Sequence, residues 1–298
     1  MWRLKMLSFR RFNKESDYNI MRNIVQHNCL EAGHISPQLH IGNLDFERYA
    51  FEENPDVLYK TTWFVANGET EIGFITVQED EFYITVLIEF KCLMDDILNY
   101  IENNCYTQGS TISTDANSED ILLNRTLEQR GYTKTGYFRF NGICDLSKVP
   151  LYTPLPDEFV IRLTKKKDIV RRAALFGLAT GGTGTTPENY ERMMSSPSYC
   201  DAMDFVVENH NSEIVAYCTI WNDPISKIAI LEPLACIAEY RRKGIMKSTL
   251  LYGMNILKEC GTKFIYVGTG GSNVASQALY KSVGFVEYGV NSEWVKIL

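Results

Sequence analysis

The sequence is poor in the residues and spacings that hold metal ions. It contains four histidines in 298 residues, and none of its eight cysteines forms a Cys-x-x-Cys pair with another. Zinc sites and redox disulfides usually show such pairs, so both are disfavoured. We therefore expect no metal, histidines in loops or at the surface, and reduced cysteines that are mostly buried as small apolar side chains.

Long apolar runs are also missing. No run approaches the roughly 20 residues that a membrane-spanning helix needs. Residues 1–11 are interrupted by charge before an apolar segment long enough for a secretion signal can develop. These absences favour a cytoplasmic protein without a membrane partner.

Positive charge is scarce in the first half of the chain. Residues 1–150 contain 14 Lys and Arg against 22 Asp and Glu, whereas residues 151–298 contain 16 against 15. An acidic surface repels nucleic acid, and it attracts cationic ligands such as amines. We therefore expect a small-molecule partner and no nucleic acid.

The chain has the length and the composition of two ordinary globular domains, with 298 residues of which 45% are hydrophobic and 22% are charged. The segment 145–157 contains Pro150, Pro154 and Pro156, and prolines cannot donate to a sheet ladder. We place the domain boundary here, between an N-terminal domain, 1–150, and a C-terminal domain, 151–298.

Strand and helix patterns alternate through the second half. Runs of β-branched and aromatic residues predict strands, and apolar residues at helical spacing predict helices. This order indicates a mixed α/β sheet. The expected strands are 159–163, 204–208, 213–221, 227–237 and 264–267, with two closing strands after residue 285, and the expected helices are 166–178, 187–194, 244–260 and 274–283.

The first half repeats the order of the second. Residues 64–77 resemble residues 206–219. Residues 127–132 likewise resemble residues 280–285, because both segments end an expected helix with a glycine followed by an aromatic residue. Between these landmarks the first half is eleven residues shorter. We infer a duplication in which one copy lost a ligand loop. Each half should then be a mostly antiparallel, twisted sheet flanked by helices.

A cationic turn, residues 241–247, joins an apolar strand to an amphipathic helix in the second half. Its glycine lets backbone N–H groups approach a ligand, and the helix start presents the positive end of a dipole. A solvated helix start with common basic residues would share some of these features. The preceding strand and the next motif favour a phosphate cradle. Its members are Arg241, Arg242, Lys243, Gly244, Ile245, Met246 and Lys247.

A second motif, Asn273-Val-Ala-Ser-Gln-Ala-Leu-Tyr-Lys-Ser-Val-Gly-Phe285, follows the cationic turn at a fitting distance. Together the motifs resemble the GNAT superfamily of acyl-CoA N-acyltransferases over residues 158–298. Met246 and Ser276 depart from the small residue and the alanine that are usual there. The tandem layout is similar to that of mycothiol synthase. The matching residues are Arg241, Gly244, Asn273, Leu279, Tyr280, Gly284 and Phe285.

The resemblance implies that acetyl-CoA binds the second half, with its pyrophosphate in the cationic turn and with no metal. The strand near residues 234–237 would separate from its neighbour, so that Leu234, Cys236 and Ile237 contact pantetheine and the acyl oxygen. Asn273 and Ser276 would also contact this co-substrate. Asparagine is equally a preferred helix N-cap, so Asn273 has two possible roles.

The resemblance also makes Tyr280 the general acid for a departing thiolate, a role that suits a phenol with a pKa near 10. An ordinary core tyrosine would explain the same residue. Glu232 is the candidate general base, although a surface glutamate at a strand edge would look alike. Cys236 would permit an acyl-enzyme, but no histidine lies near it in the sequence, so we favour a buried small side chain.

These observations predict an N-acetyltransferase, monomeric or homodimeric, that moves an acetyl group from acetyl-CoA to a primary amine of a small molecule by direct attack. A non-catalytic CoA-binding or regulatory module remains an alternative, as does an acyltransferase with another acyl group or a hydroxyl acceptor. The first half has no cationic turn, and Leu127 stands where the acid belongs. We expect it to be silent and to shape the acceptor pocket.

Overall fold

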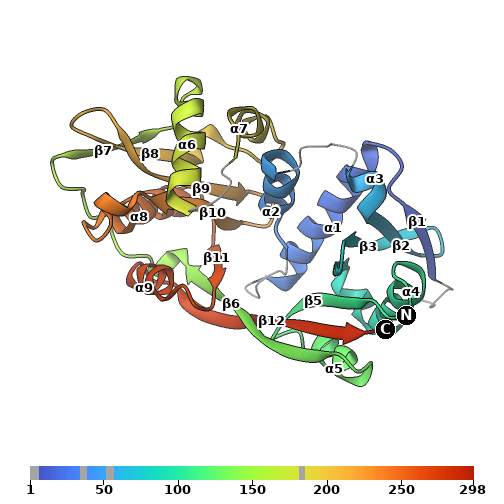
Figure 1. Ribbon diagram of the computed structural model, residues 1–298. Helices are drawn as coiled ribbons and strands as arrows, with labels where there is room; N and C mark the ends of the chain where they lie inside the picture. The colour runs from blue at the N-terminus through green and yellow to red at the C-terminus, as the bar shows by residue number, and fades with distance from the viewer. Residues whose placement is uncertain (1–6, 34–38, 52–56, 181–184) are drawn as a thin grey trace.

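A single sheet passes through both halves of the protein (Figure 1). The computed structural model describes residues 7–33, 39–51, 57–180 and 185–298. Within these ranges the sheet has 12 strands in the order β1-β2-β3-β4-β5-β12-β6-β11-β10-β9-β8-β7. The strands are β1 (Leu7–Arg11), β2 (Thr62–Asn67), β3 (Thr70–Gln78), β4 (Glu81–Val86), β5 (Thr111–Asn117), β6 (Thr133–Asp145), β7 (Phe159–Leu163), β8 (Asp204–Asn209), β9 (Ile214–Asp223), β10 (Ile228–Cys236), β11 (Phe264–Gly270) and β12 (Val286–Ile297).

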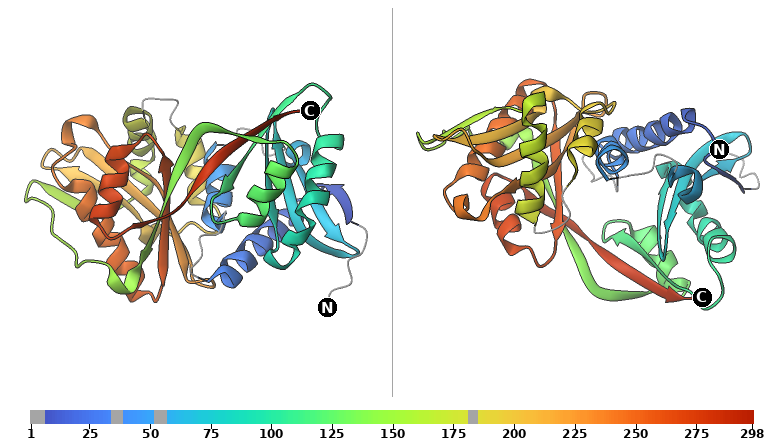
Figure 2. Two further views of the ribbon diagram at one scale, coloured as in Figure 1. Left: turned by 90° about the horizontal axis from the view of Figure 1, so that it is seen from below. Right: turned by 45° about the horizontal axis from the view of Figure 1, so that its top comes forward.

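Helices cover both faces of the sheet, and apolar clusters fill the space between the layers. Figure 2 shows α1 and α2 between the two halves. Among the described residues, no helix combines the length and the apolar composition that crossing a membrane would require. One face carries α1 (Ser16–Ala32), α2 (Ile41–Phe46), α6 (Ile169–Thr180) and α7 (Pro187–Met194), and the other carries α4 (Met94–Asn104), α5 (Ile121–Gln129), α8 (Ile245–Glu259) and α9 (Val274–Ser282).

The second half follows the predicted order of strands and helices. The mixed α/β class is confirmed, and the sheet is mostly antiparallel, with parallel pairing only between β10 and β11 and between β4 and β5 in the described residues. α6 begins at Ile169 because residues 166–168 form a short 3₁₀ turn. The prediction of two closing strands is wrong, since β12 runs on as one strand with an irregularity between Glu287 and Val290.

The two halves exchange their last strands. β6 follows α5 in the first half, yet it pairs with β11 of the second half from Phe264↔Asp145 to Gly270↔Arg139. β12 follows α9 in the second half and pairs with β5 of the first half, for example at Asn291↔Asn117. β12 and β6 then pair with each other. The exchange covers the edges that β5 and β11 would otherwise expose, so the sheet is continuous.

Both parallel pairs separate soon after they begin. β10 and β11 pair only at residues 228–230 with residues 264–266, and the last pair is Ile230↔Tyr266. β4 and β5 share a single pair, Glu81↔Ser113. A slot therefore opens in each half where main-chain groups have lost a neighbouring strand. The predicted separation of the strand near residues 234–237 agrees with this geometry.

The cysteines divide between core and surface. Cys29, Cys144, Cys218 and Cys236 are buried, which agrees with the expected role as small apolar side chains. Cys92, Cys200 and Cys260 are exposed, because they lie on the solvent side of loops and helix ends. The expectation that most of the cysteines are buried therefore does not hold for these three. All eight are unpaired in the described residues.

Candidate active site

The start of α8 is exposed and positively charged. Gly244 is its N-cap with φ 80°, a left-handed conformation that suits glycine, and no side chain of the described residues caps this helix. Free N–H groups at a helix start attract anions. The side chains of Arg241, Arg242, Lys243 and Lys247 are exposed around it. The residues predicted as a phosphate cradle therefore gather at one uncapped, cationic helix N-terminus.

The side chains of this turn differ in what they contact. The side chains of Ile245, which is buried, and Met246, which is half-buried, pack in an apolar cluster. Because both residues belong to the first turn of an uncapped helix, their main-chain N–H groups have no partner within the helix. Arg241 Nε donates a hydrogen bond to the main-chain oxygen of Cys236 at 2.9 Å. This bond ties the turn to the end of β10, so Arg241 braces the loop whatever else it contacts.

Two main-chain amides face the slot of the second half. The N–H of Ile237 donates to Val215 of β9 at 3.1 Å. Because alternate residues of an antiparallel strand bond to the same neighbour, the N–H of Ala235 also points to β9, and those of Leu234 and Cys236 point into the slot. Of the three strand residues predicted to contact a ligand, Ile237 therefore has no N–H to offer.

The Cys236 thiol is buried beside these amides. Its Sγ donates to the main-chain oxygen of Ile237 at 3.5 Å, and burial raises its pKa to about 11. A nucleophilic cysteine requires the thiolate form, which this environment disfavours. The geometry supports the interpretation of Cys236 as a small apolar side chain.

Glu232 lies where β10 and β11 have separated, and α2 of the first half holds it. Asn43 Nδ2 donates to Glu232 Oε2 at 2.7 Å. Trp221 Nε1, from the neighbouring strand β9, donates to the main-chain oxygen of Glu232 and so helps to fix this part of β10. Burial raises the pKa of the Glu232 carboxyl, while the charge of Arg139 and the bond from Asn43 oppose that rise. Glu232 is thus an oriented carboxyl group, unlike a free surface glutamate.

Tyr280 is buried in the core cluster that also contains Leu231 of β10 and Val267 of β11. Its ring centroid lies 5.8 Å from that of Phe285. Burial raises the pKa of its hydroxyl well above the usual value, a hydrogen bond with Ser276 lowers it, and the charge of Glu232 raises it further. The predicted acid and base are therefore close enough to interact electrostatically. The Tyr280 hydroxyl keeps its proton at any physiological pH.

Asn273 has the capping role that its residue type suggests. Its Oδ1 accepts a hydrogen bond from the N–H of Ser276 at 3.1 Å, and its Nδ2 donates to Thr269 at 3.2 Å. Both bonds fix the start of α9 beside the open end of β11. Asn273 thereby positions the helix that carries Ser276 and Tyr280.

A cavity of about 700 Å³ lies beside Glu232, and its walls come from both halves. α2 contributes one wall, β3, β4 and β5 contribute another, and the exchanged strands β6 and β12 contribute a third. Several polar side chains line the cavity among apolar ones. They include Glu47, Tyr83, Asp115, Arg139, Glu232 and Asn291.

Glu47 and His40 stand on the α2 side of this cavity. Glu47 follows Asn43 by four residues, so both lie on one face of the helix and its π-helical continuation, residues 47–51. The side chain of Glu47 is open to the cavity. The surrounding protein atoms still remove part of its solvation, and this effect, followed by the charge of Glu232, raises its pKa to about 7. His40 caps α2 by accepting from Gly42 N–H at 3.0 Å, and burial lowers its pKa to about 4. His40 thus lies in the loop before α2, as expected, but it is buried and not at the surface.

The sequence analysis missed Glu47, Asp115, Arg139 and the cavity itself. These residues belong to the first half or to the exchanged strand β6, and no motif marks them. The pairing order of the strands brings Asp115 and Arg139 toward Glu232, and the packing of α2 against β9 and β10 brings Glu47 there. Both are long-range contacts that no local sequence signal marks.

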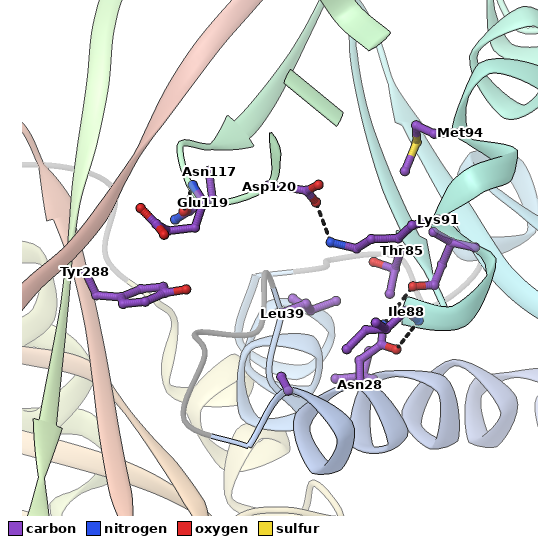
Figure 3. A pocket seen from close by; sticks show the side chains of 13 residues that line it. Asn28, Leu39, Thr85, Ile88, Lys91, Met94, Asn117, Glu119, Asp120 and Tyr288 are labelled. Atoms are coloured by element: carbon purple, nitrogen blue, oxygen red, sulfur yellow. Dashed lines mark hydrogen bonds and ion pairs between the residues drawn. The ribbon is translucent and has the colours of Figure 1, made fainter. Parts of the chain in front are cut away.

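The equivalent slot of the first half is closed by its own side chains (Figure 3). Asn28 of α1 donates from Nδ2 to the Val86 oxygen at 2.9 Å and accepts at Oδ1 from the Ile88 N–H at 3.2 Å. Lys91 and Asp120 form an ion pair of 2.6 Å across the slot, as Figure 3 shows. A space of about 90 Å³ remains. Asn28 thus occupies the main-chain groups that a ligand would need.

The helix that follows this slot also lacks the features of an anion site. The first turn of α4 contains Asp95 and Asp96, whose charges repel anions. Leu127, at the position equivalent to Tyr280, is fully buried. The described residues of the whole chain bring no three His, Cys, Asp or Glu side chains together in a way that would hold a metal ion.

Residues 182–285 match the sequence model of the acetyltransferase (GNAT) family. A comparison with curated proteins found no match. A GCN5-related N-acetyltransferase from Sphaerobacter thermophilus has a similar structure, with a TM-score of 0.63 and 15% identity over 97% of this chain and 95% of that chain. A tandem GNAT protein from the clavulanic acid biosynthesis pathway has a TM-score of 0.64 and 12% identity over 98% of each chain.

N-myristoyltransferase of Saccharomyces cerevisiae, solved with myristoyl-CoA, has a TM-score of 0.56 and 13% identity over 98% of this chain and 79% of that chain. At such low identities these likenesses concern the fold. The family match itself spans the whole of α8 and α9, where the uncapped helix start and Tyr280 lie. Residues 182–285 therefore match the GNAT acetyltransferase family, and the whole chain has the fold of solved GNAT proteins, a tandem one among them.

Proposed function

We propose that the protein transfers an acetyl group from acetyl-CoA to a primary amine of a small molecule. One observation carries this proposal: β10 leaves β11 after Ile230, with the polar cavity beside Glu232 and the cationic, uncapped start of α8 soon after the end of the strand. A long acyl thioester with an anionic end needs such an arrangement. The yeast N-myristoyltransferase structure, which shares the fold, holds an acyl-CoA.

The proposal divides the work between the halves. Residues 151–298 bind acetyl-CoA, which supplies an activated acetyl group when bound. Arg242, Lys243, Lys247 and the first N–H groups of α8 hold the pyrophosphate. Residues 1–150 bind no acetyl-CoA and shape the acceptor cavity through α2, β4 and β5.

Direct attack needs no nucleophile from the protein. The amine nitrogen forms a bond to the acyl carbon, and the carbon–sulfur bond breaks with its electron pair on sulfur. Glu232 accepts the proton that the amine loses, and Tyr280 donates a proton to the sulfur. The N–H groups of Leu234 and Cys236 stabilise the negative charge on the acyl oxygen during this exchange.

Thiol release from acetyl-CoA with a panel of amines tests the proposal. Tyr280→Phe should lower kcat by about 10²-fold with little change in the affinity for CoA. Tyr252→Phe, on α8, is the matched control and should leave kcat unchanged. CoA binding without thiol release in any reaction would instead support a non-catalytic CoA-binding module. Propionyl-CoA, longer acyl-CoA and hydroxyl acceptors in the same assay separate the remaining alternatives.

A further inference from the structure

Arg139 is a cation that faces the acceptor cavity without a close counter-charge. It lies on the exchanged strand β6 and lines the cavity, and no carboxylate of the described residues forms an ion pair with it. Its charge acts at longer range on Glu47, Asp115 and Glu232. An accessible guanidinium in a polar cavity is suited to bind a carboxylate through two parallel hydrogen bonds.

The strand register places Arg139 across the slot from Glu232. Ile230 and Tyr266 form the last pair of β10 and β11, so Glu232 and Gly268, two residues further on each strand, lie at the same level and on the same face. Arg139 Nη2 is 3.6 Å from the position that a Cβ would take at Gly268. The cavity therefore has an acidic wall at Glu232 and a cationic group above β11.

Three asparagines lie beside Arg139 and are joined by hydrogen bonds. Asn291 Oδ1 accepts hydrogen bonds from Asn117 Nδ2 and Asn141 Nδ2, each at 2.8 Å. These bonds orient the side-chain amide of Asn291. Asn291 of β12 is the residue paired in register with Arg139 of β6. No described residue accepts from its Nδ2. A donor from Asn291 and the guanidinium of Arg139 thus stand together at one place in the cavity.

We infer that the acceptor is a small amine that also carries a carboxylate, with the amine at the wall formed by Glu232 and Glu47 and the carboxylate at Arg139 and Asn291. This inference rests on the proposed acetyl transfer. An amine without an anionic group would be drawn to the carboxylates but would face the like charge of Arg139, which weakens its binding. A zwitterion satisfies both walls at once.

Matched acceptor pairs test the inference. We suggest common amino acids against the amines that lack only the carboxylate, such as lysine with cadaverine, ornithine with putrescine and histidine with histamine. Thiol release gives kcat and KM for each, and calorimetry on the CoA complex gives binding without turnover. The best amino acid should exceed its matched amine in kcat/KM by about tenfold or more.

Arg139→Gln should remove this preference by raising KM for the amino acid about tenfold to a hundredfold, with little effect on the matched amine. Arg139→Lys should restore part of it. Arg125→Gln, an exposed arginine of α5, is the control and should change nothing.

The outcomes separate the two proposals. Equal use of amines and amino acids, or an amino-acid preference that Arg139→Gln leaves intact, overturns the inference while acetyl transfer stands. Amino acids that bind the CoA complex through Arg139 without thiol release support the inference and contradict the proposed transfer. If no amino acid of the panel binds or reacts, the inference is overturned.

Discussion

Glu232 and Glu47 reach one cavity wall from different halves of the chain. Asn43 holds Glu232 through a hydrogen bond that lowers the pKa of its carboxyl. Glu47, four residues after Asn43, has a pKa raised to about 7. The acceptor amine would therefore meet two carboxyl groups whose protonation depends on each other.

At the residue scale, the bond from Asn43 should set the pH dependence of turnover. Asn43→Ala removes a contact that favours the charged form of Glu232, so the pKa of Glu232 rises. The rising limb of kcat against pH should then move to higher pH. Glu232→Gln should lower kcat by about 10²-fold to 10⁴-fold across the profile. A limb that does not move in Asn43→Ala would show that Glu232 is not the titrating base.

Glu47 should also make the folded state sensitive to pH. Its pKa is raised on folding to about 7, so the protonated form is favoured in the folded state, and this contribution is lost as pH rises from about 4.5 through about 7. Glu47→Gln should therefore raise Tm relative to the native protein at pH 8 but not at pH 5. We expect on the order of 1–2 °C, because the side chain faces water in the cavity.

Thermal unfolding at both pH values measures this difference. Glu69→Gln, in the exposed turn between β2 and β3, is the control for loss of one surface charge. Equal shifts in Tm at pH 5 and pH 8 would contradict the raised pKa of Glu47.

At the scale of the element, α8 offers a comparison between its two ends. Gly244 at its start and Gly261 after its end both have φ near 80°, and a Cβ would meet no atom within 4 Å at either position. Alanine at either glycine should therefore cost about 1–2 kcal/mol of stability for conformational reasons alone. Only Gly244→Ala should also weaken CoA binding, since only that residue shapes the phosphate turn.

Calorimetry with CoA and thermal unfolding of both variants decide this point. Equal CoA affinities in Gly244→Ala and Gly261→Ala would place the pyrophosphate elsewhere. A loss of affinity in both would indicate a general effect of stability.

The elements of the second half could be predicted because their signals are local. The spacing of Gly244 and Tyr280 in two motifs and the apolar periodicity of α8 depend on a few neighbouring residues. The partners of β6 and β12 could not be predicted, because the same alternation of side chains suits either pairing. Arg139 depends on that pairing and Glu47 on the packing of α2 against β9 and β10, so neither could be placed in the cavity from local patterns.

At the scale of the whole molecule, one chain should bind one CoA. The slot of the first half is occupied by Asn28, and α4 begins with acidic residues. Asn28→Ala should lower stability by about 1–3 kcal/mol, because it leaves the Val86 oxygen and the Ile88 N–H without their partner. It should not create a second CoA site. Calorimetric stoichiometry checks this, and a value near two for either protein would contradict it.

The strand exchange should also make the halves dependent on each other. Separate chains of residues 1–150 and 151–298 would each carry a strand whose partners lie in the other chain. We expect neither to unfold cooperatively alone, and we expect co-expression to recover a complex with the native Tm. Two stable, independent fragments would contradict this.

The same exchange bears on how the two copies have evolved. The first half has no turn like residues 241–247, yet it supplies β6, and with it Arg139, to the sheet of the second half. Deletion of the first half would remove an internal strand from the sheet of the second. We therefore expect the first half to be retained for the strand that it contributes, whether or not its own slot binds a ligand.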